Sequence, residues 1–450
     1  MDSRYLIQNY MFKDDFITVV KAKGIRLYGI DGREYLDCSA SPLSNTLGYG
    51  NEEMIETISE QLKQLSFAYR VELENPMTNQ AAADVSEWTN GEFNKVFFVS
   101  GGSEATEAVM GLAKEYHLAN GKAGKYKIIS RWISYHGSTK GALSISGLPL
   151  RRNMMQQYFP EMGHIPPAYC YQCWYGKQPG SCDLECAKAL EDEIIMQDPN
   201  TVAAFIMEPL SGTSIAAAYP LNERYFEKIR IICDKYDILL IYDEVMTGFG
   251  RTGYNMAFNR FKVKPDMFTF GKSVSGGYYP AGGVATTDNI IAPIKDNIGL
   301  FPVGYTWCGN PVVSRVISKT IEIYKRDHLV EKVKKDGEYL LTELNSMANR
   351  HPTMGDVRGL GLMLGVEFVQ DKGTKEPIKK DKKSFAAAFG HACVERGMII
   401  EAMSGSNIKA QAGDLALWGP QYVSTMDDYG QMLQIFEESL TQTEKEFGFQ

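Results

Sequence analysis

Two ionisable residues stand at the ends of short apolar runs, where a solvated surface residue would not need to be. The run "LLIYD" ends in Asp243, and "FTFG" is followed at once by Lys272. A buried carboxylate requires a partner, so Asp243 predicts a cation nearby. A partly desolvated lysine loses its proton more easily, and the neutral amine is a nucleophile that can form a Schiff base. The alternative for Lys272 is an exposed loop lysine.

The segment "SGGSEATEA", residues 100–108, indicates an anion-binding turn between a strand and a helix. Gly101 and Gly102 would let an anion approach the backbone, and Ser103 adds a hydroxyl group. The N–H groups and dipole of the following helix favour a phosphate there. The G-x-G-x-x-G spacing of dinucleotide sites is absent. A tight turn with an ordinary helix cap is the alternative.

These three features together fit pyridoxal 5′-phosphate. Asp243 would face the pyridine nitrogen and keep it protonated, so that the ring withdraws electrons from the carbon that carries the amine. Lys272 would bond to the cofactor and, once released, carry a proton between that carbon and the cofactor.

The elements that must position these residues alternate between strand-like and helix-like segments, which predicts a largely parallel sheet covered by helices. In such sheets, ligands bind beyond the carboxyl ends of the strands. Five strand-like runs are followed directly by residues with chemical function: Ser100 to Ser103, Tyr135 and His136, Glu208, Asp243, and Lys272. We therefore expect one active site at this edge.

The chain changes character near residue 312, after which Lys- and Glu-rich helical patterns dominate. We predict a large domain at 61–315 and a smaller α+β domain formed by 1–60 and 316–450. Within the smaller domain the patterns predict a hairpin at 24–37, a strand in 355–371, and helices at 313–349, 383–396 and 426–446.

The bulk composition excludes several classes of protein. The 450 residues are 44% hydrophobic and 23% charged, with a net charge of −8 that disfavours nucleic acid and anionic membranes as partners. No apolar run reaches the roughly 18 residues of a transmembrane helix. The N-terminal residues resemble no signal peptide. We expect a cytoplasmic protein.

Four of the eight cysteines crowd into one segment with the spacing C-x2-C-x8-C-x3-C. They are Cys170, Cys173, Cys182 and Cys186. The pattern permits a four-thiolate zinc site. Its central gap is shorter than the one usual between paired zinc knuckles, so we favour packed thiols in a surface loop and expect no metal.

Over nearly its whole length the chain resembles the class III aminotransferases of the fold type I superfamily of pyridoxal-phosphate enzymes. The resemblance rests on "VSGGSEATEA", "SYHGST", "MEPLSG", "IYDEVMTGFGRTG", "FGKSVSGGYYPAGG" and "GYTWCGNP". It implies a seven-stranded, mainly parallel sheet between helices, with a smaller α+β domain. It also implies ping-pong transfer of an amino group from an amine donor to a 2-oxo acid, by a homodimer or a dimer of dimers.

The resemblance assigns roles to particular residues. Lys272 and Asp243 would be catalytic and would also bind the cofactor. The other cofactor-binding residues would be Gly102, Ser103, Tyr135, His136, Glu208, Val245 and, acting on the neighbouring subunit's phosphate, Thr306. We interpret His136 as a packed loop histidine rather than a base, and Glu244 as a turn cap or the partner of an arginine. Arg251 and Arg358 are interpreted as structural.

The residues at the positions expected to bind the substrate depart from the family pattern. Met246 stands where many members have glutamine, and Leu417 where many have a carboxylate-binding arginine. Arg151, Arg152 and Lys409 are the remaining candidates for binding an acidic group, or they are solvated surface charges.

The "CYQCWYG" insert resembles a subgroup of ω-amino acid and taurine-type transaminases. The expected donor is therefore taurine, β-alanine or a similar amine, with 2-oxoglutarate or pyruvate as acceptor. A racemase or epimerase, an aminomutase or a phospho-lyase on the same scaffold is the alternative. A purely structural role would need neither Lys272 nor Asp243.

Overall fold

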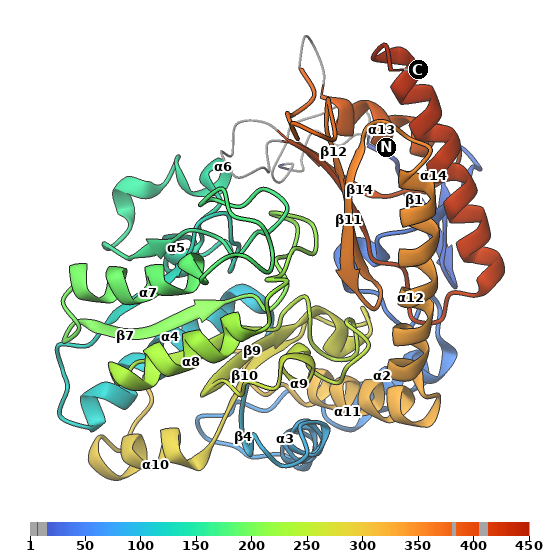
Figure 1. The fold of residues 1–450 in the computed structure, drawn as a ribbon. Helices are drawn as coiled ribbons and strands as arrows, with labels where there is room; N and C mark the ends of the chain where they lie inside the picture. The colour runs from blue at the N-terminus through green and yellow to red at the C-terminus, as the bar shows by residue number, and fades with distance from the viewer. Residues whose placement is uncertain (1–6, 8–15, 380–383, 405–412, 450) are drawn as a thin grey trace.

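The computed structural model describes residues 7, 16–379, 384–404 and 413–449, and its centre is a seven-stranded sheet (Figure 1). The strand order is β4-β10-β9-β8-β7-β5-β6. The strands are β4 (Lys95–Val99), β5 (Lys127–Arg131), β6 (His164–Ile165), β7 (Val202–Met207), β8 (Leu239–Asp243), β9 (Met267–Gly271) and β10 (Gly282–Thr286). Only β10 is antiparallel to its neighbours, so the other six end at the same edge.

Helices cover both faces of this sheet, which explains why its strands read as continuous apolar runs. Every residue of β7, β8, β9 and β10 is buried. On β7, Phe205 belongs to one hydrophobic core and the next residue, Ile206, to another on the opposite face. The second core includes Ala108 and Val109 of helix α4 (Gly102–Ala119), whereas Phe226 and Ile229 of helix α8 (Arg224–Lys235) belong to the first.

The helices around the sheet vary in length and were in part predictable from their ends. Asn75 caps α3 and Pro76 occupies its first turn, both common helix-start signals. The helices are α3 (Pro76–Trp88), α4 (Gly102–Ala119), α5 (Lys140–Ile145), α6 (Pro149–Arg152), α7 (Glu185–Met196), α8 (Arg224–Lys235), α9 (Ala257–Phe261), α10 (Asp288–Asn297) and α11 (Pro311–Arg326), with short 3-10 turns η1 (Gln156–Tyr158) and η2 (Lys272–Ser275).

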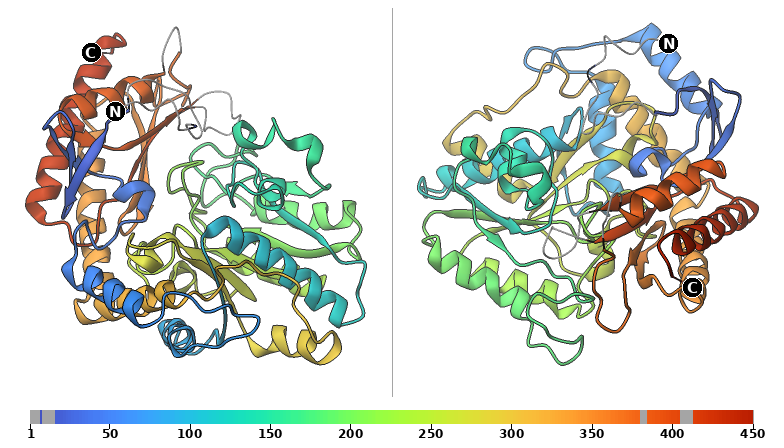
Figure 2. Two further views of the ribbon diagram at one scale, coloured as in Figure 1. Left: turned by 180° about the vertical axis from the view of Figure 1, so that it is seen from behind. Right: turned by 90° about the horizontal axis from the view of Figure 1, so that it is seen from above.

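Segments from both ends of the chain lie together beside the seven-stranded sheet (Figure 2). One four-stranded sheet has the order β1 (Val19–Lys23), β2 (Arg26–Gly29), β3 (Glu34–Asp37) and β13 (Met398–Ile399). The expected hairpin is confirmed: β2 and β3 pair antiparallel across a turn in which Gly32 has φ 82°. β13 pairs parallel to β3, so one sheet joins a segment of the N-terminal region to a segment of the C-terminal region.

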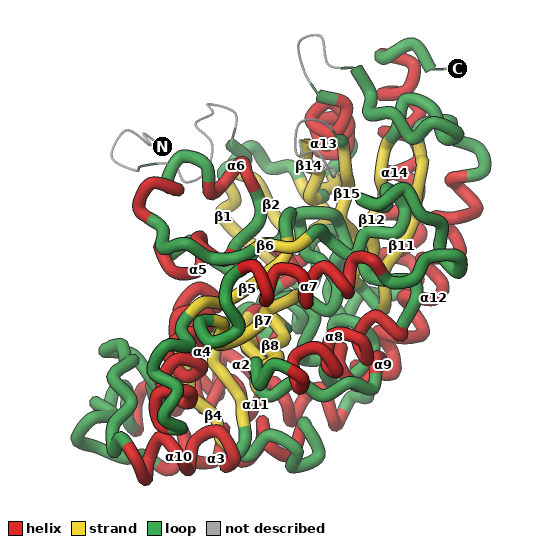
Figure 3. The backbone as a smooth tube through the Cα atoms, turned by 60° about the vertical axis from the view of Figure 1, so that its left-hand side comes forward, coloured by secondary structure: helices red, strands yellow, loops and turns green. Residues whose placement is uncertain are grey.

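A second four-stranded sheet near the C-terminus is antiparallel throughout (Figure 3). Its strands, in order, are β11 (Met354–Leu360), β12 (Met363–Phe368), β15 (Asp414–Trp418) and β14 (Glu401–Ser404). The remaining helices are α1 (Ala40–Leu43), α2 (Glu52–Gln64), α12 (Leu329–Ala348), α13 (Phe385–Glu395) and α14 (Met426–Glu446).

Two sequence expectations for this region are corrected. The single strand expected within 355–371 is the hairpin β11–β12, which turns at Gly361 with φ 55°. The single helix expected at 313–349 is two helices, because His328 takes the left-handed conformation between α11 and α12. The helices expected at 383–396 and 426–446 are present as α13 and α14. The division into domains at residues 60 and 315 stays a prediction.

Within the described part of the chain, no helix has both the length and the apolar character needed to cross a membrane.

Candidate active site

A cavity of about 160 Å³ lies where five strands of the large sheet end. The residues that follow β4, β5, β7, β8 and β9 all contribute to its wall, as the parallel arrangement requires. The wall is formed by Gly102, Ser103, Tyr135, His136, Gly137, Glu208, Leu210, Asp243, Val245, Met246 and Lys272. Eight of these are sequence-predicted site residues, so the structure brings together the groups that the apolar runs indicated.

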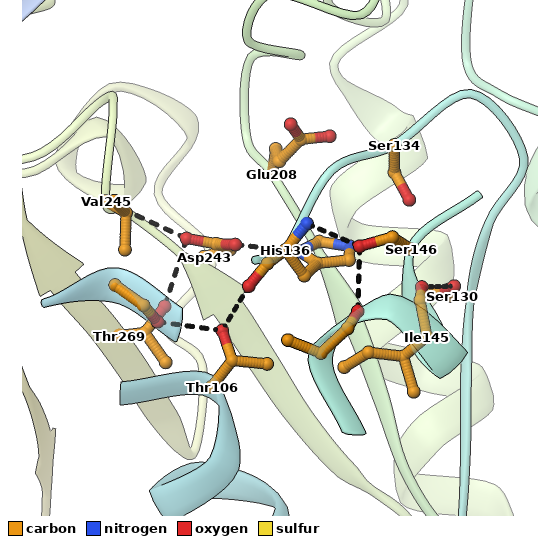
Figure 4. A network of polar contacts seen from close by, with 12 residues as sticks. Thr106, Ser130, Ser134, His136, Ile145, Ser146, Glu208, Asp243, Val245 and Thr269 are labelled. Atoms are coloured by element: carbon orange, nitrogen blue, oxygen red, sulfur yellow. Dashed lines mark hydrogen bonds and ion pairs between the residues drawn. The ribbon is translucent and has the colours of Figure 1, made fainter. Parts of the chain in front are cut away.

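Asp243 ends β8, and its carboxylate is held by three donors (Figure 4). His136 Nδ1 lies 2.7 Å from Oδ2 and donates to it, because an ionised carboxylate only accepts. Oδ1 accepts the backbone N–H of Val245 at 3.1 Å and the hydroxyl of Thr269 at 3.0 Å. The aspartate is buried, and these bonds fix the direction in which it faces the cavity.

Thr269 is a contact that sequence reasoning missed. It lies on β9, directly paired with Asp243 across the two parallel strands. The available signal is a lone hydroxyl residue inside the otherwise apolar strand "MFTFG". A buried threonine in a central strand requires a hydrogen-bond partner, and here that partner is the aspartate on the neighbouring strand.

His136 is buried, as a packed loop histidine would be, but its ring is also bonded to the aspartate. Its backbone N–H donates to Ser146 Oγ at 2.9 Å, and its backbone carbonyl accepts from Thr106 Oγ1 at 2.6 Å. Among the described residues, its Nε2 is buried without a partner. We therefore describe His136 as a positioning residue for Asp243.

The start of α4 has the close packing that a phosphate cradle needs. A Cβ added to Gly102 would lie 2.9 Å from Val245 Cγ1, so only glycine fits there. Gly137 has φ 135°, and an added Cβ would lie 2.8 Å from Ser103 Oγ. Behind them stands an 18-residue helix whose N-terminus favours an anion. The observed geometry therefore fits the phosphate of pyridoxal 5′-phosphate.

Lys272 follows β9 and opens the turn η2 in the left-handed conformation, with φ 46°. Such backbone strain in a residue other than glycine is typical of functional sites. The hydroxyl of Tyr324 donates to the next carbonyl, that of Ser273, at 2.6 Å and secures the turn. Burial lowers the pKa of Lys272. A strained, partly desolvated lysine facing a fixed aspartate is the arrangement that imine chemistry requires.

Glu208 directly follows β7 and is buried. Its Oε1 accepts the backbone N–H of Gly212 at 3.2 Å, and its Oε2 lies 3.8 Å from Nη2 of Arg131. Arg131 also donates to the backbone carbonyl of Glu208 at 2.6 Å. Burial raises the pKa of this carboxyl group.

Glu244, next to the catalytic candidate, faces away from the cavity. It accepts hydrogen bonds from Thr247 Oγ1 and from the backbone N–H groups of Ala257 and Phe258, at 3.1 and 3.0 Å. It therefore caps the start of α9 rather than only the turn after β8 that was expected, and it bonds that turn through Thr247. Burial raises its pKa to about 7.

Two buried arginines have structural contacts. Arg251 donates to the backbone carbonyls of Leu43, Leu362 and Pro420. Arg358 donates to the backbone carbonyls of Ile215 and Ala216 and to the carboxylates of Asp356 and Glu367. Both arginines join segments that are far apart in the chain.

The three substrate-binding candidates are placed differently. The Arg151 guanidinium lies 4.8 Å above the Tyr135 ring, which lines the cavity, and its charge acts on Lys272. Arg152 packs 5.1 Å from the Trp132 ring instead. Lys409 lies outside the described residues. Among the described candidates, therefore, Arg151 is the one whose charge reaches the site.

Thr306 does not contribute to this cavity. It lines a separate hollow of about 590 Å³, together with Tyr69, Phe98 and Tyr305. Within one chain, Thr306 therefore lies apart from the cradle formed by Gly102 and Ser103.

The four clustered cysteines line a small cavity of about 30 Å³ and are all free thiols. Within the described ranges, no group of three or more His, Cys, Asp or Glu side chains is arranged to hold a metal ion. The expectation that this cluster holds no metal stays a prediction.

The fold and this site together define an aminotransferase. A family model for the class III aminotransferases matches residues 10–437, and the chain belongs to this family of pyridoxal-phosphate-dependent enzymes. It is 33% identical over 443 residues to gamma aminobutyrate transaminase 2 of Solanum lycopersicum. The match covers 95% of this chain and 92% of that protein.

Two solved structures of transaminases support this family assignment. A transaminase from the marine bacterium Virgibacillus superposes with a TM-score of 0.92 at 29% identity, covering 99% of this chain and 98% of that one. An omega transaminase from Pseudomonas jessenii in complex with PMP has the same TM-score, identity and coverage.

Proposed function

We propose that this aminotransferase moves an amino group from an ω-amino acid or similar amine, such as taurine or β-alanine, to 2-oxoglutarate or pyruvate. The observation that carries the proposal is the strained, partly desolvated Lys272 in one cavity with the fixed carboxylate of Asp243. Similarity to a γ-aminobutyrate transaminase and to omega transaminases supports a donor whose amine is remote from its acid group.

The residues around the cavity would hold pyridoxal 5′-phosphate in one orientation. The phosphate would lie at the start of α4, against Gly102 and Ser103, and the ring would lie between Tyr135 and Val245. Asp243 would accept a hydrogen bond from the protonated pyridine nitrogen and keep it protonated, while His136 and Thr269 hold the carboxylate in place. When bound, the cofactor supplies an aldehyde that bonds to amines and a ring that withdraws electrons from the neighbouring carbon.

Lys272 would bind the cofactor and then act as the proton carrier of the reaction. Burial lowers its pKa, so a larger share of the amine is neutral near pH 7 than in a surface lysine. A neutral amine can take a proton from the substrate carbon, and the resulting ammonium can return it. Glu208 would lie at the edge of the ring, with its own pKa raised by burial.

Arg151 is the proposed partner of the substrate's acid group. Its guanidinium rests on Tyr135, and a planar fork suits a carboxylate or a sulfonate. Leu417 is fully buried in β15 and offers no charge for this purpose. The proposed donor would therefore be held by its acid group near α6.

We also propose that the working unit is a homodimer or a dimer of dimers. Thr306 would bind the phosphate held by the neighbouring subunit. Large apolar side chains are exposed near this segment, which favours a covered face. They are Phe67, Tyr69, Val71, Leu73, Leu300 and Trp307. The eight free thiols fit a reducing compartment, and we propose the cytoplasm.

A panel of amine donors and 2-oxo acid acceptors, followed through the absorbance of the cofactor, tests the proposed function. With a true donor and no acceptor, the pyridoxal form should convert stoichiometrically to the pyridoxamine form. Adding the acceptor should restore the first spectrum. A racemase or epimerase would show no net conversion, and that outcome would replace transamination by the alternative reaction class.

A further inference from the structure

A hollow lies at the end of the large sheet opposite to the candidate active site. Lys95 begins β4, and Thr286, the last residue of the antiparallel strand β10, is paired with it. The active-site residues Gly102 and Ser103 follow the other end of β4. The hollow has a volume of about 380 Å³ and is lined in part by α10, which Figure 1 shows at the lower edge of the sheet. None of the roles described above uses it.

Most of the wall of this hollow is apolar. Leu112 of α4, Val284 of β10 and Ile294 of α10 line it, and all three are buried. Phe97 and Phe301 also line it, and their rings meet edge to face with centroids 5.4 Å apart. An apolar surface that faces water is unfavourable unless something covers it. The wall therefore favours an apolar occupant.

Lysines supply the charge at this hollow. Lys95 and Lys295 both line it, and no aspartate or glutamate is among the described residues that do. Lys95 Nζ lies 3.1 Å from Oδ1 of Asp288, an acid outside the lining. Lys295 is exposed, and a lysine in such a position packs its stem on the apolar wall while its ammonium stays in water. The lining of the hollow is therefore positively charged.

These two features fit a molecule that has an apolar chain and one anionic end. The chain would cover the apolar wall, and the anion would stay near the surface, beside the two ammonium groups, where little desolvation is needed. A volume of about 380 Å³ is toward the lower end of the range for small-ligand sites. A medium-length alkyl carboxylate has this size and this distribution of charge.

A second copy of the chain is the competing occupant. Leu300 lines the hollow and also belongs to the exposed apolar face assigned above to the dimer. However, the buried core of a subunit interface is depleted in lysine, and two lysines line this hollow. The charge therefore favours a small amphipathic anion over the apolar face of a second subunit.

We propose that this hollow binds medium-chain alkyl carboxylates, with the chain against Val284 and Ile294 and the carboxylate beside Lys95 and Lys295. This site goes beyond the proposed transamination, because the hollow shares no lining residue with the candidate active site. Burial of the chain supplies the affinity, and the lysines select an anion.

Isothermal titration calorimetry measures this binding in the cofactor-loaded protein. The ligands are octanoate, nonanoate and decanoate, each below its micellar concentration. One molecule should bind per chain, and affinity should rise about fourfold with each added methylene, the effect of burying one such group. Decylamine has the same chain length and the opposite charge, and it should bind about 10-fold more weakly than decanoate. Equal affinities for decanoate and decylamine would overturn the proposal.

Two variants locate the bound molecule. Lys295→Glu reverses one charge and should weaken decanoate binding by about 5- to 10-fold, whereas uncharged decanol should bind as it does to wild type. Ile291→Trp, at a lining residue of α10, fills the hollow with a larger side chain and should weaken both ligands by about 10-fold. Lys335→Glu, at an exposed lysine on α12, is the matched control and should change neither affinity.

Each result supports or overturns the proposal. Weaker decanoate binding in both variants, with the control unchanged, supports it. The same decanoate affinity in wild type and both variants would place the ligand elsewhere and overturn it. Absence of binding in wild type would also overturn it, and a weakened dimer of Ile291→Trp in sedimentation velocity would then assign the hollow to a second subunit. Because binding is measured without turnover, failure of the proposed transamination would leave these results unchanged.

Discussion

The His136 ring nitrogen Nδ1 lies 2.7 Å from Oδ2 of Asp243, and this contact joins the loop after β5 to the end of β8. The carboxylate that would face the cofactor is therefore held by a histidine whose backbone N–H and carbonyl are themselves bonded to Ser146 and Thr106. Removing either partner should affect the cofactor's electronic state as well as its position.

Asp243→Asn should keep the fold and lower the rate of transamination by about 10²- to 10³-fold, the usual cost of losing one electrostatic group in a reacting site. The physical reason is that an amide does not hold the pyridine nitrogen in its protonated form. Single-turnover absorbance changes measure this effect. A wild-type rate in Asp243→Asn would refute the pairing of this residue with the ring.

His136→Gln should weaken the orientation of Asp243 without removing its charge. We expect a smaller loss, about 10-fold, together with a shifted pH dependence of the cofactor spectrum. A double-mutant cycle with Asp243→Asn should show strong coupling, because the two groups form one hydrogen-bonded unit. Additive effects of the two substitutions would argue that the histidine only packs.

Lys272→Ala should abolish turnover while pyridoxal 5′-phosphate stays bound without a covalent bond. The phosphate cradle and Asp243 remain intact, so binding should persist, but no side chain is left to carry the proton. Absorbance and mass spectrometry of the protein after borohydride treatment distinguish the two modes of binding. Lys264→Ala, at an exposed lysine, serves as the control. Retained activity in Lys272→Ala would refute the assignment of Lys272 as the catalytic lysine.

The acid next to the site gives a prediction about stability and pH. Burial raises the pKa of folded Glu244 from the ordinary value of 4.5 to about 7, so the folded protein binds this proton more tightly than the unfolded chain. The associated contribution is fully present below pH 4.5 and is lost as pH rises through 7, about 3 kcal/mol in all.

The stability of Glu244→Gln should therefore not fall in this way as pH rises. Urea midpoints measured between pH 4.5 and 8 should fall more steeply for wild type than for the variant. Glu343→Gln, at an exposed position on α12, should follow wild type. Parallel curves for wild type and Glu244→Gln would show that the hydrogen bonds to Glu244 outweigh its burial.

Thr306→Ala tests the proposed dimer. If this hydroxyl binds the phosphate of the neighbouring subunit, its loss should weaken cofactor binding by about 10- to 100-fold, the usual value of a hydrogen bond to a charged group. Equilibrium dialysis of the cofactor measures the change, and sedimentation velocity checks that the dimer persists. Thr441→Ala, at an exposed helix position, is the control. Unchanged affinity would place Thr306 away from the phosphate.

Much of the large sheet and of its cavity followed from the sequence, because both depend on local patterns. Apolar runs mark buried parallel strands, and residues just beyond such runs must meet at one edge. Asp243 and Lys272 were found in this way. Thr269 was missed because its function depends on register between neighbouring strands, which one sequence does not state.

The break at His328 had no local signal, because neither glycine nor proline marks it.

The parallel pair of β3 and β13 has a consequence for how the chain is made. During synthesis β3 emerges early, but its partner emerges only after nearly all other strands. Until then the edge of β3 stays open, and an open edge can pair with another chain. Chains that stop before residue 398 should therefore aggregate through the N-terminal hairpin, even when their large sheet is complete.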